Sequence, residues 1–236
     1  MLQFYFLSIA VNFLAGLVLS ADSLVRIPDY LSWEEASTLQ SSGCTPWRAL
    51  ALEAQTRPGE TVLTLGSGNV SVFGTQIAKQ MLGARVIATS SSDRKLEAMR
   101  ALGADSTVNY LTHPDWEKQV LALTGGRGAD VVLNTVGWPT LEKCLLACAS
   151  EGRIMYIGAM KKPVQLDALP NLIMRGITIK GFSVGSRRML EDFLRAMDVT
   201  RLHPHIDRVF RFEEAVDAVR YADGGGRVGK VVIRVS

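Results

Sequence analysis

The sequence predicts an α/β fold, a doubly wound parallel sheet of six strands with helices on both of its faces. From residue 61 onward, short apolar segments alternate with longer segments of helical periodicity. The apolar segments lack the polar alternation of a half-exposed strand, which is typical of parallel strands buried on both faces. A chain of 236 residues, 47% of them hydrophobic, is large enough to bury such a core.

Three short elements precede the sheet. The segment 24–27 predicts a short strand, because it is apolar and a proline follows it. Ser32, followed by two glutamates in the first turn, predicts the N-cap of a helix. A second helix is expected over 45–54, and the turn 57–60 ends it.

Strands and helices then alternate along the chain. Asp93 is expected to cap the second helix of the sheet, and Gly103 to end it. The crossovers between strands should be right-handed. The strands are expected over 61–65, 85–89, 106–110, 131–136, 153–158 and 177–182, and the helices over 70–82, 93–102, 116–124 and 141–149.

The C-terminal part of the chain departs from this alternation. A helix is expected over 189–197, a strand over 208–212, a helix over 213–221 and a last strand over 230–235. The three consecutive glycines at 224–226 predict a flexible turn before that strand.

A glycine-rich turn joins the first strand of the sheet to the first helix. It reads Gly66-Ser67-Gly68-Asn69-Val70-Ser71. Gly66 permits a tight turn, and Gly68 lets the backbone approach a pyrophosphate at the helix N-terminus, whose N–H groups are free. Ser71 takes the place of a third glycine and is small enough for close packing. An ordinary βα turn is the alternative, but the repeating βα context favours a Rossmann-type dinucleotide-binding domain.

The end of the second strand selects between the two nicotinamide dinucleotides. An NAD enzyme usually places an acidic residue there to hold the ribose 2′-hydroxyl. Here the strand ends at Ser90, and Asp93 is expected to cap a helix. Ser90, Ser92 and Lys95, with the neighbouring arginine, can bind a 2′-phosphate. NADP(H) is therefore favoured over NAD(H), the alternative being that Lys95 belongs to a solvated helix face.

Composition excludes several other classes of protein. The net charge is only +3, and basic and acidic residues are interspersed, so we expect no nucleic-acid partner. The three cysteines do not form a CxxC pair, which argues against a disulfide framework and a cysteine zinc site. Cys144 and Cys148 are expected to share the buried face of one helix, and a reducing, cytoplasmic compartment is the simpler interpretation.

The N-terminal segment 1–20 is atypical because residues 4–19 are almost entirely apolar. This stretch is short for a membrane span, and no basic residue precedes it as in a signal peptide. Three interpretations stay open. The segment is a signal or anchor, which would make the protein secreted or membrane-anchored, or it covers an apolar interface, or it marks where a preceding domain was lost or wrongly joined. We favour the last.

Several stretches together resemble the medium-chain dehydrogenase/reductase family, in its zinc-type alcohol dehydrogenase and quinone or enoyl reductase branch. They are ADSLVRIPD at 21–29, GCTPWRAL at 43–50, VLTLGSGNVSVFGTQIAK at 62–79, ARVIATSSSDRKLEAMRALGAD at 84–105 and VGKVVI at 228–233.

The resemblance implies two domains, a GroES-like catalytic domain and the Rossmann domain. On this basis 21–43 is a remnant of the catalytic domain, 44–182 is the Rossmann domain, and 183–236 returns to the catalytic domain, most of which is missing. The family commonly dimerises through the edge strand, here 177–182, so a homodimer is expected.

The resemblance also implies roles for individual residues. Alternatives remain for three of them, since Val136 and Ile157 would be apolar at any strand end and Tyr110 could simply cover the core. The implied cofactor contacts are Thr45 near the nicotinamide, Gly66, Gly68 and Val70, with Asn69 of the same turn, at the pyrophosphate, Ser90, Ser92 and Lys95 at the 2′-phosphate, Tyr110 near the adenosine, and Val136, Ile157 and Phe182 around the nicotinamide ring.

No zinc and no catalytic residue are predicted. Ser41 stands where zinc-dependent members have a cysteine ligand, and His203 and His205 form only one spaced pair. Neither Tyr156 nor His113 has the spacing of a proton relay.

The expected function is zinc-independent hydride transfer between a nicotinamide, preferably NADPH, and a small alcohol, carbonyl, quinone or enoyl substrate. The alternative is a non-catalytic NADP(H)-binding module or degenerate paralogue.

Overall fold

The computed structural model describes residue 20 and residues 24–160 and 164–235. The apolar stretch 4–19, for which three interpretations were given above, lies outside the described residues. No helix within the described ranges combines the length and the apolar character needed to cross a membrane.

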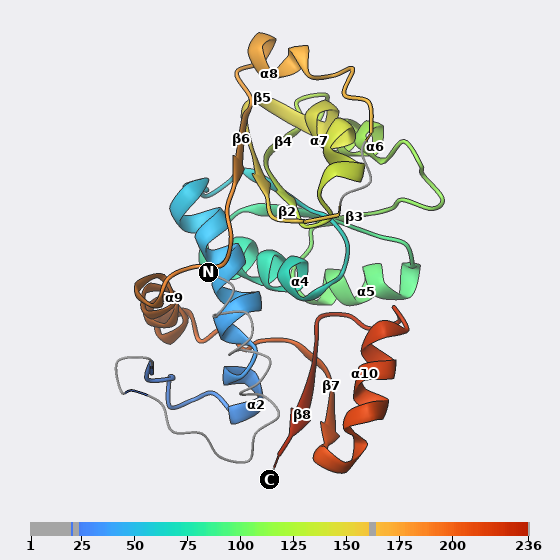
Figure 1. Cartoon of the computed structure of the whole chain (residues 1–236). Helices are drawn as coiled ribbons and strands as arrows, with labels where there is room; N and C mark the ends of the chain where they lie inside the picture. The colour runs from blue at the N-terminus through green and yellow to red at the C-terminus, as the bar shows by residue number, and fades with distance from the viewer. Residues whose placement is uncertain (1–19, 21–23, 161–163, 236) are drawn as a thin grey trace.

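The centre of the molecule is a six-stranded parallel sheet, as predicted (Figure 1). The order of its strands is β3-β2-β1-β4-β5-β6, so the chain moves outward from β1 in one direction and then from β4 in the other. Between β1 and β4 this order reverses, and in open α/β sheets ligands bind at the carboxyl ends of the strands on either side of such a point. The strands are β1 (Thr61–Thr64), β2 (Arg85–Ser90), β3 (Ser106–Asn109), β4 (Ala129–Asn134), β5 (Cys148–Tyr156) and β6 (Thr178–Gly181).

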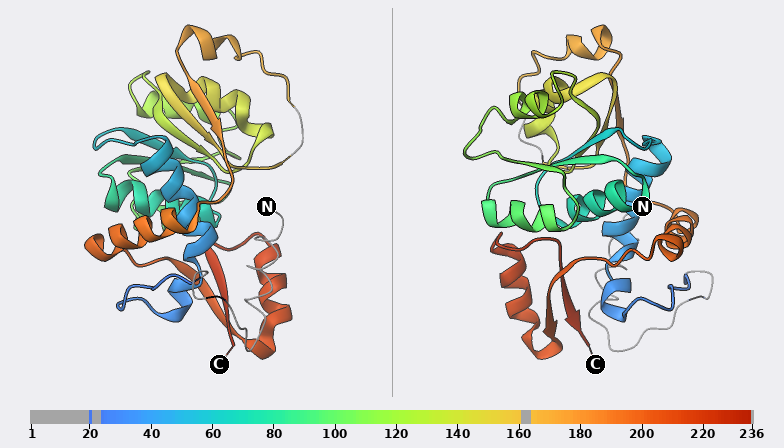
Figure 2. Two further views of the ribbon diagram at one scale, coloured as in Figure 1. Left: turned by 60° about the vertical axis from the view of Figure 1, so that its left-hand side comes forward. Right: turned by 180° about the vertical axis from the view of Figure 1, so that it is seen from behind.

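Helices cover both faces of the sheet (Figures 1 and 2). Adjacent strand residues therefore enter different cores: Val62 of β1 packs into one cluster, and Leu63 packs into the other. This explains why the strands read as continuous apolar runs. The covering helices are α4 (Asn69–Gln76, continued as a π-helix over Ile77–Met81) and α5 (Asp93–Ala101) on one face, and α6 (Trp116–Leu123) and α7 (Leu141–Ala147) on the other.

The segment before the sheet is mostly helical. Ser32 caps α2 (Trp33–Ala36), and it forms a capping box with Glu35, whose carboxylate accepts the Ser32 N–H at 2.8 Å. The helix predicted over 45–54 is α3 (Cys44–Trp47) followed by a π-helical segment (Arg48–Glu53), and a further π-helical segment (Leu39–Gly43) precedes it.

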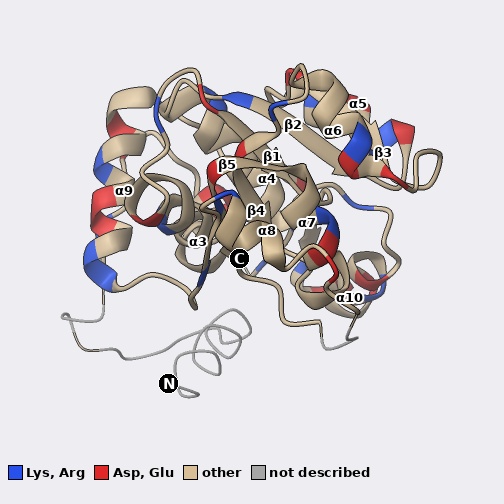
Figure 3. Cartoon of the chain, turned by 90° about the horizontal axis from the view of Figure 1, so that it is seen from above, with Lys and Arg blue, Asp and Glu red and all other residues tan. Residues whose placement is uncertain are grey.

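The C-terminal part forms a separate layer beside α4 and α5 (Figures 1 and 2). Its strands β7 (Ile206–Arg211) and β8 (Lys230–Arg234) pair in parallel, and α10 (Ala215–Asp223) connects them. The last strand therefore has a partner within the chain. The preceding helix α9 (Arg187–Thr200) packs against α3, where Phe193 stacks on Trp47. Basic and acidic side chains alternate along α9, in keeping with the mixed charge of the sequence (Figure 3).

Four local predictions were wrong. The segment 24–27 is not a strand, because no strand among the described residues pairs with it. Ser92, and not Asp93, is the N-cap of α5, and the Asp93 carboxylate instead accepts a hydrogen bond from Asn109 Nδ2 at 2.8 Å. Cys148 begins β5, where it pairs with Ala129, and is not in the helix of Cys144.

The fourth wrong prediction is the end of β4. Asn134 ends the strand two residues early, because its side-chain Oδ1 accepts the N–H groups of Val136 (3.1 Å) and Gly137 (2.7 Å) and turns the chain. Helix α8 (Pro170–Met174) was not predicted, although the proline in its first turn was a signal for it.

An ion pair ties the helical segment before the sheet to the edge strand. The Glu53 carboxylate accepts hydrogen bonds from Lys180 of β6 and from Arg48 Nε at 3.0 Å. The hydrogen bond from Lys180, assisted by Arg48, holds the pKa of Glu53 below its usual value. Folding therefore favours the ionised carboxylate, and this contribution to stability is present above the pKa of the unfolded state and lost as the pH falls through the folded-state pKa.

We expect Glu53→Gln to lower the free energy of unfolding by about 1 kcal/mol at pH 7, a decrease in Tm of roughly 2–4 °C. The difference between variant and wild type should shrink as the pH falls through the lowered folded-state pKa of Glu53, because the wild-type carboxyl is then protonated as well. Thermal melts of wild type and variant from pH 7 to pH 3 measure this difference in Tm. A constant difference across that range would contradict the role given to the charge.

Candidate functional site

The glycine turn between β1 and α4 is held by side chains of neighbouring strands. Gly66 has φ +78°, a left-handed conformation that favours glycine, and its N–H donates to Thr89 Oγ1 at 3.1 Å. Ser71 is buried and donates its hydroxyl to the Leu65 carbonyl at 2.7 Å. A serine can thus stand at the third position of the motif because its hydroxyl is satisfied by the strand it packs on.

Gly68 occupies the N-cap of α4, where no side chain accepts a hydrogen bond from the first-turn N–H groups. Its backbone is extended, with φ −77° and ψ 176°, which any residue can adopt. A Cβ added at Gly68 would meet nothing within 4 Å. Neither conformation nor packing therefore explains a glycine here. The open space leaves room for a ligand to approach the backbone, and the free N–H groups of the helix suit a phosphate.

A cavity of about 210 Å³ opens over this turn at the carboxyl ends of β1 and β2. Two cationic side chains, Lys95 and Arg227, line it, and none of the described carboxylates does. Such a lining favours an anionic ligand. The glycines Gly66 and Gly68, the serines Ser67, Ser90 and Ser91, and Tyr110, Ala222 and Gly225 complete it.

The C-terminal segment forms one wall of this cavity. Lys95 donates to the carbonyl of Gly225, and Arg94 donates to that of Gly226. Arg227 Nη1 donates to Asn69 Oδ1 at 2.8 Å, directly at the start of α4. The basic residues at the start of α5 thus contact the backbone of the C-terminal loop 224–226, and they do not form only a solvated helix face.

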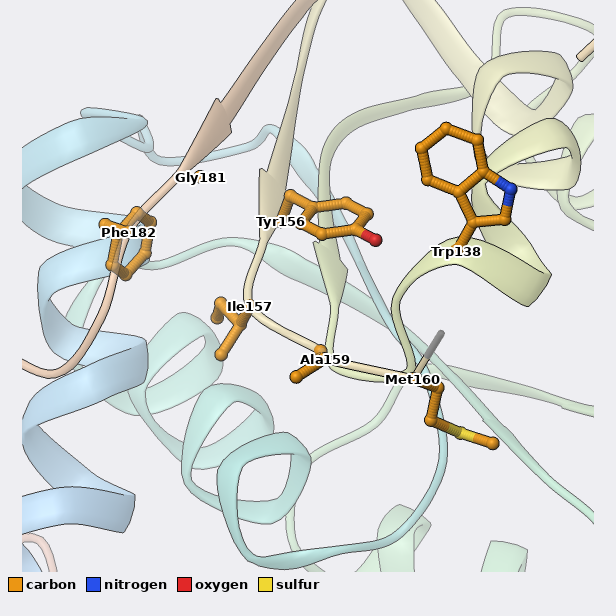
Figure 4. A pocket seen from close by; sticks show the side chains of 8 residues that line it. Trp138, Tyr156, Ile157, Ala159, Met160, Gly181 and Phe182 are labelled. Atoms are coloured by element: carbon orange, nitrogen blue, oxygen red, sulfur yellow. The ribbon is translucent and has the colours of Figure 1, made fainter. Parts of the chain in front are cut away.

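A second cavity, of about 510 Å³, lies at the carboxyl ends of β5 and β6. Figure 4 shows Tyr156 and Trp138 on one side of the end of β5 and Ile157 on the other. Its lining is mainly apolar and aromatic, and includes Phe182 and Met160. The two cavities lie on opposite sides of the point where the strand order reverses, so together they suit an elongated ligand with an anionic part and a flat, less polar part.

Comparison with known proteins decides the family. A family model described as zinc-binding dehydrogenase matches residues 70–199, more than half of the chain. The chain belongs to the medium-chain dehydrogenase/reductase family. A zinc-type alcohol dehydrogenase-like protein of Schizosaccharomyces pombe is 37% identical to this chain over 92% of the present sequence. Quinone oxidoreductase-like protein 2 of Bos taurus is 34% identical over 89% of the present sequence.

Solved structures of other medium-chain dehydrogenases/reductases share the fold. An NAD-dependent alcohol dehydrogenase superposes with a TM-score of 0.82 at 38% identity, covering 92% of this chain and 63% of that one. The quinone oxidoreductase of Thermus thermophilus, solved also as its complex with NADPH, superposes with a TM-score of 0.77 at 32% identity, covering 91% and 70%. The two curated relatives are longer, and the chain spans 64% and 63% of their lengths.

The structure of this medium-chain dehydrogenase/reductase brings seven of the twelve predicted cofactor residues into the two cavities. The smaller cavity contains Gly66, Gly68, Ser90, Lys95 and Tyr110, and the larger contains Ile157 and Phe182.

The other five predicted cofactor residues line neither cavity. Asn69 contacts Arg227, Val70 packs on the core, and Ser92 caps α5. Val136 packs against the second core cluster. Thr45 is buried and donates its hydroxyl to the Ser41 carbonyl at 2.6 Å.

Sequence reasoning missed Arg227 and Trp138. Arg227 was overlooked because the segment 183–236 was assigned to the catalytic domain, so its basic residues were not weighed as cofactor contacts. The available signal was its position directly after the predicted glycine turn. Trp138 follows β4 in the short 3₁₀ turn Trp138–Thr140, a type of element that periodicity does not reveal.

The described residues do not fit the zinc ion that the family name implies. Within residues 24–160 and 164–235 no three His, Cys, Asp or Glu side chains gather as a metal would require. Cys44 is buried, and burial raises the pKa of its thiol to about 11, which disfavours the thiolate that a metal binds. His203 is engaged with Glu35, its Nδ1 lying 2.7 Å from the carboxylate.

Proposed function

We propose that the protein is a zinc-independent oxidoreductase that transfers a hydride between a nicotinamide dinucleotide, preferably NADPH, and a small alcohol, carbonyl, quinone or enoyl substrate. The observation that carries the proposal is the glycine at position 68, whose backbone is open to an approaching ligand at the floor of a cavity lined by cations. The relatives include an NAD-dependent alcohol dehydrogenase and a quinone oxidoreductase solved with NADPH, which supports a nicotinamide cofactor.

The cofactor, when bound, supplies the hydride donor or acceptor, and the residues of the chain bind and orient it. The N–H groups at the start of α4 would hold the diphosphate. The apolar lining around Ile157 and Phe182 would receive the nicotinamide and exclude water from it. Tyr110 would cover the adenosine, because its half-exposed ring lines the smaller cavity.

The preference for NADPH is assigned to Lys95. Its ammonium group lies in the lining beside Ser90 and Ser91, and its partner is a backbone carbonyl, so its charge is not neutralised by an acid. Asp93, the first acidic residue after the end of β2, accepts a hydrogen bond from Asn109 Nδ2. An anionic 2′-phosphate would therefore be favoured over a hydroxyl at this end of the cavity.

We expect Lys95→Ala to weaken NADPH binding about 10- to 100-fold and NADH binding by less than about threefold, because a hydrogen bond to a charged group contributes roughly 1.5–3 kcal/mol. Calorimetric titration with both cofactors measures this. Lys118→Ala is the matched control, since that lysine is exposed and forms an ion pair with Asp115. An equal loss for both cofactors would remove Lys95 from the selection of the 2′-phosphate.

Turnover tests the reaction itself. The purified chain, loaded with NADPH, is offered a panel of quinones, enals and aldehydes, and NADPH oxidation is followed by absorbance. Oxidation of NADPH with at least one of these substrates would support the proposal that the protein is an oxidoreductase. Tight binding without turnover would instead support a cofactor-binding module without catalysis.

We also propose that two copies associate through β6. It is the last strand in the order of the sheet, and β5 is its only partner among the described strands. Sedimentation of the purified chain tests this, with a dimer expected.

A further inference from the structure

The Arg48 side chain ties the segment that follows β6 to the helical segment before the sheet. Its Nη1 donates to the carbonyls of Ser183 at 3.2 Å and Val184 at 2.9 Å. Its guanidinium carbon lies 4.7 Å from the centre of the Phe182 ring. Residues 182–186 belong to no helix or strand. One guanidinium therefore takes the place of the hydrogen bonds that the sheet supplies up to the end of β6.

Arg48 is itself held in one place. Its Nε donates to Glu53 Oε1 at 3.0 Å, and the same carboxylate accepts a hydrogen bond from Lys180 of β6. Only 23% of the Arg48 side chain is exposed. One turn earlier, the helical segment approaches the same loop, because a Cβ added at Gly185 would lie 2.4 Å from Cys44 Sγ. The guanidinium thus has a defined position, and a carboxylate balances its charge.

The side chain that Arg48 contacts is part of the wall of the larger cavity. Phe182 lines this cavity together with Ile157. Figure 4 shows the Phe182 ring at the end of β6, beside the pale blue helical segment that carries Arg48. A wall that must first be ordered weakens the binding of a ligand. Because Arg48 contacts both the ring and the backbone that follows it, this wall is ordered before a ligand arrives.

We propose that Arg48 is a positioning residue for the nicotinamide half of the dinucleotide site, which fixes the Phe182 ring against which the nicotinamide packs. This inference rests on the proposed function, and it gives a role to a side chain that does not itself line the cavity. Since Glu53 balances its charge, Arg48 acts by position and not by attraction of an anion. The half of the site over the glycine turn should not depend on Arg48.

The test separates the two halves of the cofactor. The probe 2′-phospho-ADP-ribose keeps the adenosine and every phosphate of NADPH and lacks the nicotinamide. We expect Arg48→Met to weaken NADPH about 10-fold in calorimetric titration, and to change the affinity for 2′-phospho-ADP-ribose less than about twofold. The fluorescence of bound NADPH, which reports how firmly the dihydronicotinamide is held, should fall toward that of the free cofactor.

Arg153→Met is the matched control. Arg153 is 22% exposed, and it donates to the Ala54 carbonyl and to Glu60 Oε1, both at 2.6 Å. It lines neither cavity. This variant should lower the Tm as Arg48→Met does, and it should leave the ratio of the NADPH affinity to the 2′-phospho-ADP-ribose affinity as in wild type. An equal fall of that ratio in both variants would assign the effect to lost stability and overturn the proposal.

A double-mutant cycle tests whether Arg48 acts through Phe182. Phe182→Leu alone should also weaken NADPH about 10-fold, because the wall loses its ring. The double variant should then bind NADPH no more than about threefold more weakly than either single variant, because the two changes remove the same wall. Fully additive losses, roughly 100-fold below wild type, would contradict a shared route.

Arg48→Lys keeps the measurement possible if the methionine variant does not fold. The lysine keeps the charge beside Glu53 but cannot reach the ring and both carbonyls with one planar group. NADPH should weaken at least about threefold, with 2′-phospho-ADP-ribose unchanged. If wild type binds neither ligand, the proposed function fails and this inference with it. If wild type binds both, and neither Arg48 variant changes the ratio of the two affinities, this inference alone fails.

Discussion

Replacing Gly68 with alanine is expected to abolish dinucleotide binding at micromolar cofactor while leaving the protein as stable as wild type. The added methyl group would enter open space at the N-cap of α4, where nothing lies within 4 Å. It would hold a diphosphate away from the N–H groups of the helix, and losing two such charge-assisted hydrogen bonds costs about 3 kcal/mol or more, roughly a 100-fold loss of affinity at least. The backbone at Gly68 suits alanine, so the Tm should change by less than about 3 °C.

Gly226→Ala is the control for this prediction. Gly226 likewise has open space at its Cβ and no positive φ, but it lies outside the linings of both cavities. Its Tm should match that of wild type, so it controls for the effect on stability of a methyl group added in open space. Gly66→Ala provides the opposite contrast, because φ +78° at that position makes any side chain strained and the loss should appear in Tm. Unchanged NADPH binding by Gly68→Ala would show that no diphosphate approaches this turn.

Replacing Gly158 with alanine is expected to cause the largest loss of stability. Gly158 follows β5 where the chain passes the loop after β4, and an added Cβ would lie 2.1 Å from the carbonyl carbon of Val136 and 2.4 Å from the nitrogen of Gly137. These are backbone atoms, which cannot rotate away. The two segments must separate, and the hydrogen bond from Gly158 N–H to the Asn134 carbonyl, at 3.0 Å, would be strained with them. We expect a loss of about 3 kcal/mol or more, a decrease in Tm of at least roughly 6 °C.

Gly181→Ala tests whether the effect comes from the clash. Gly181 lines the same cavity, but the nearest atom to its added Cβ is the Tyr156 carbonyl oxygen at 3.8 Å, an ordinary contact. Its Tm should stay within about 2 °C of wild type. A Gly158→Ala variant as stable as Gly181→Ala would mean that β5 and the loop after β4 do not approach so closely.

The sheet could be predicted because its signal is local. Strands such as β1 are buried on both faces, and Val62 and Leu63 pack into opposite cores. Consecutive apolar residues in the sequence therefore indicate such a strand. The glycine turn was predictable for the same reason, since strand, glycines and helix are contiguous in sequence. The wrong predictions concern the ends of elements, which individual side chains determine. The side-chain amide of Asn134 ends β4. Ser92 caps α5 in place of Asp93, because the Asp93 carboxylate accepts a hydrogen bond from Asn109.

For the smaller cavity, the sequence predicts the lining residues that follow the strands of the sheet, but not those of the C-terminal segment. Ser90, Lys95 and Tyr110 follow strands whose carboxyl ends meet at one edge, so their convergence follows from the topology. Arg227 comes from a segment that reaches the turn through the pairing of β7 with β8 and the contact of Gly229 with Ser67. No periodicity in the sequence encodes that long-range contact.

A crystal structure of the chain grown with NADPH tests the central claim most directly. The account predicts the diphosphate over Gly68 within hydrogen-bond distance of the first N–H groups of α4, the 2′-phosphate beside Lys95, and the nicotinamide toward Ile157 and Phe182. A nucleotide bound elsewhere, or none at a concentration that saturates related dehydrogenases, would contradict it.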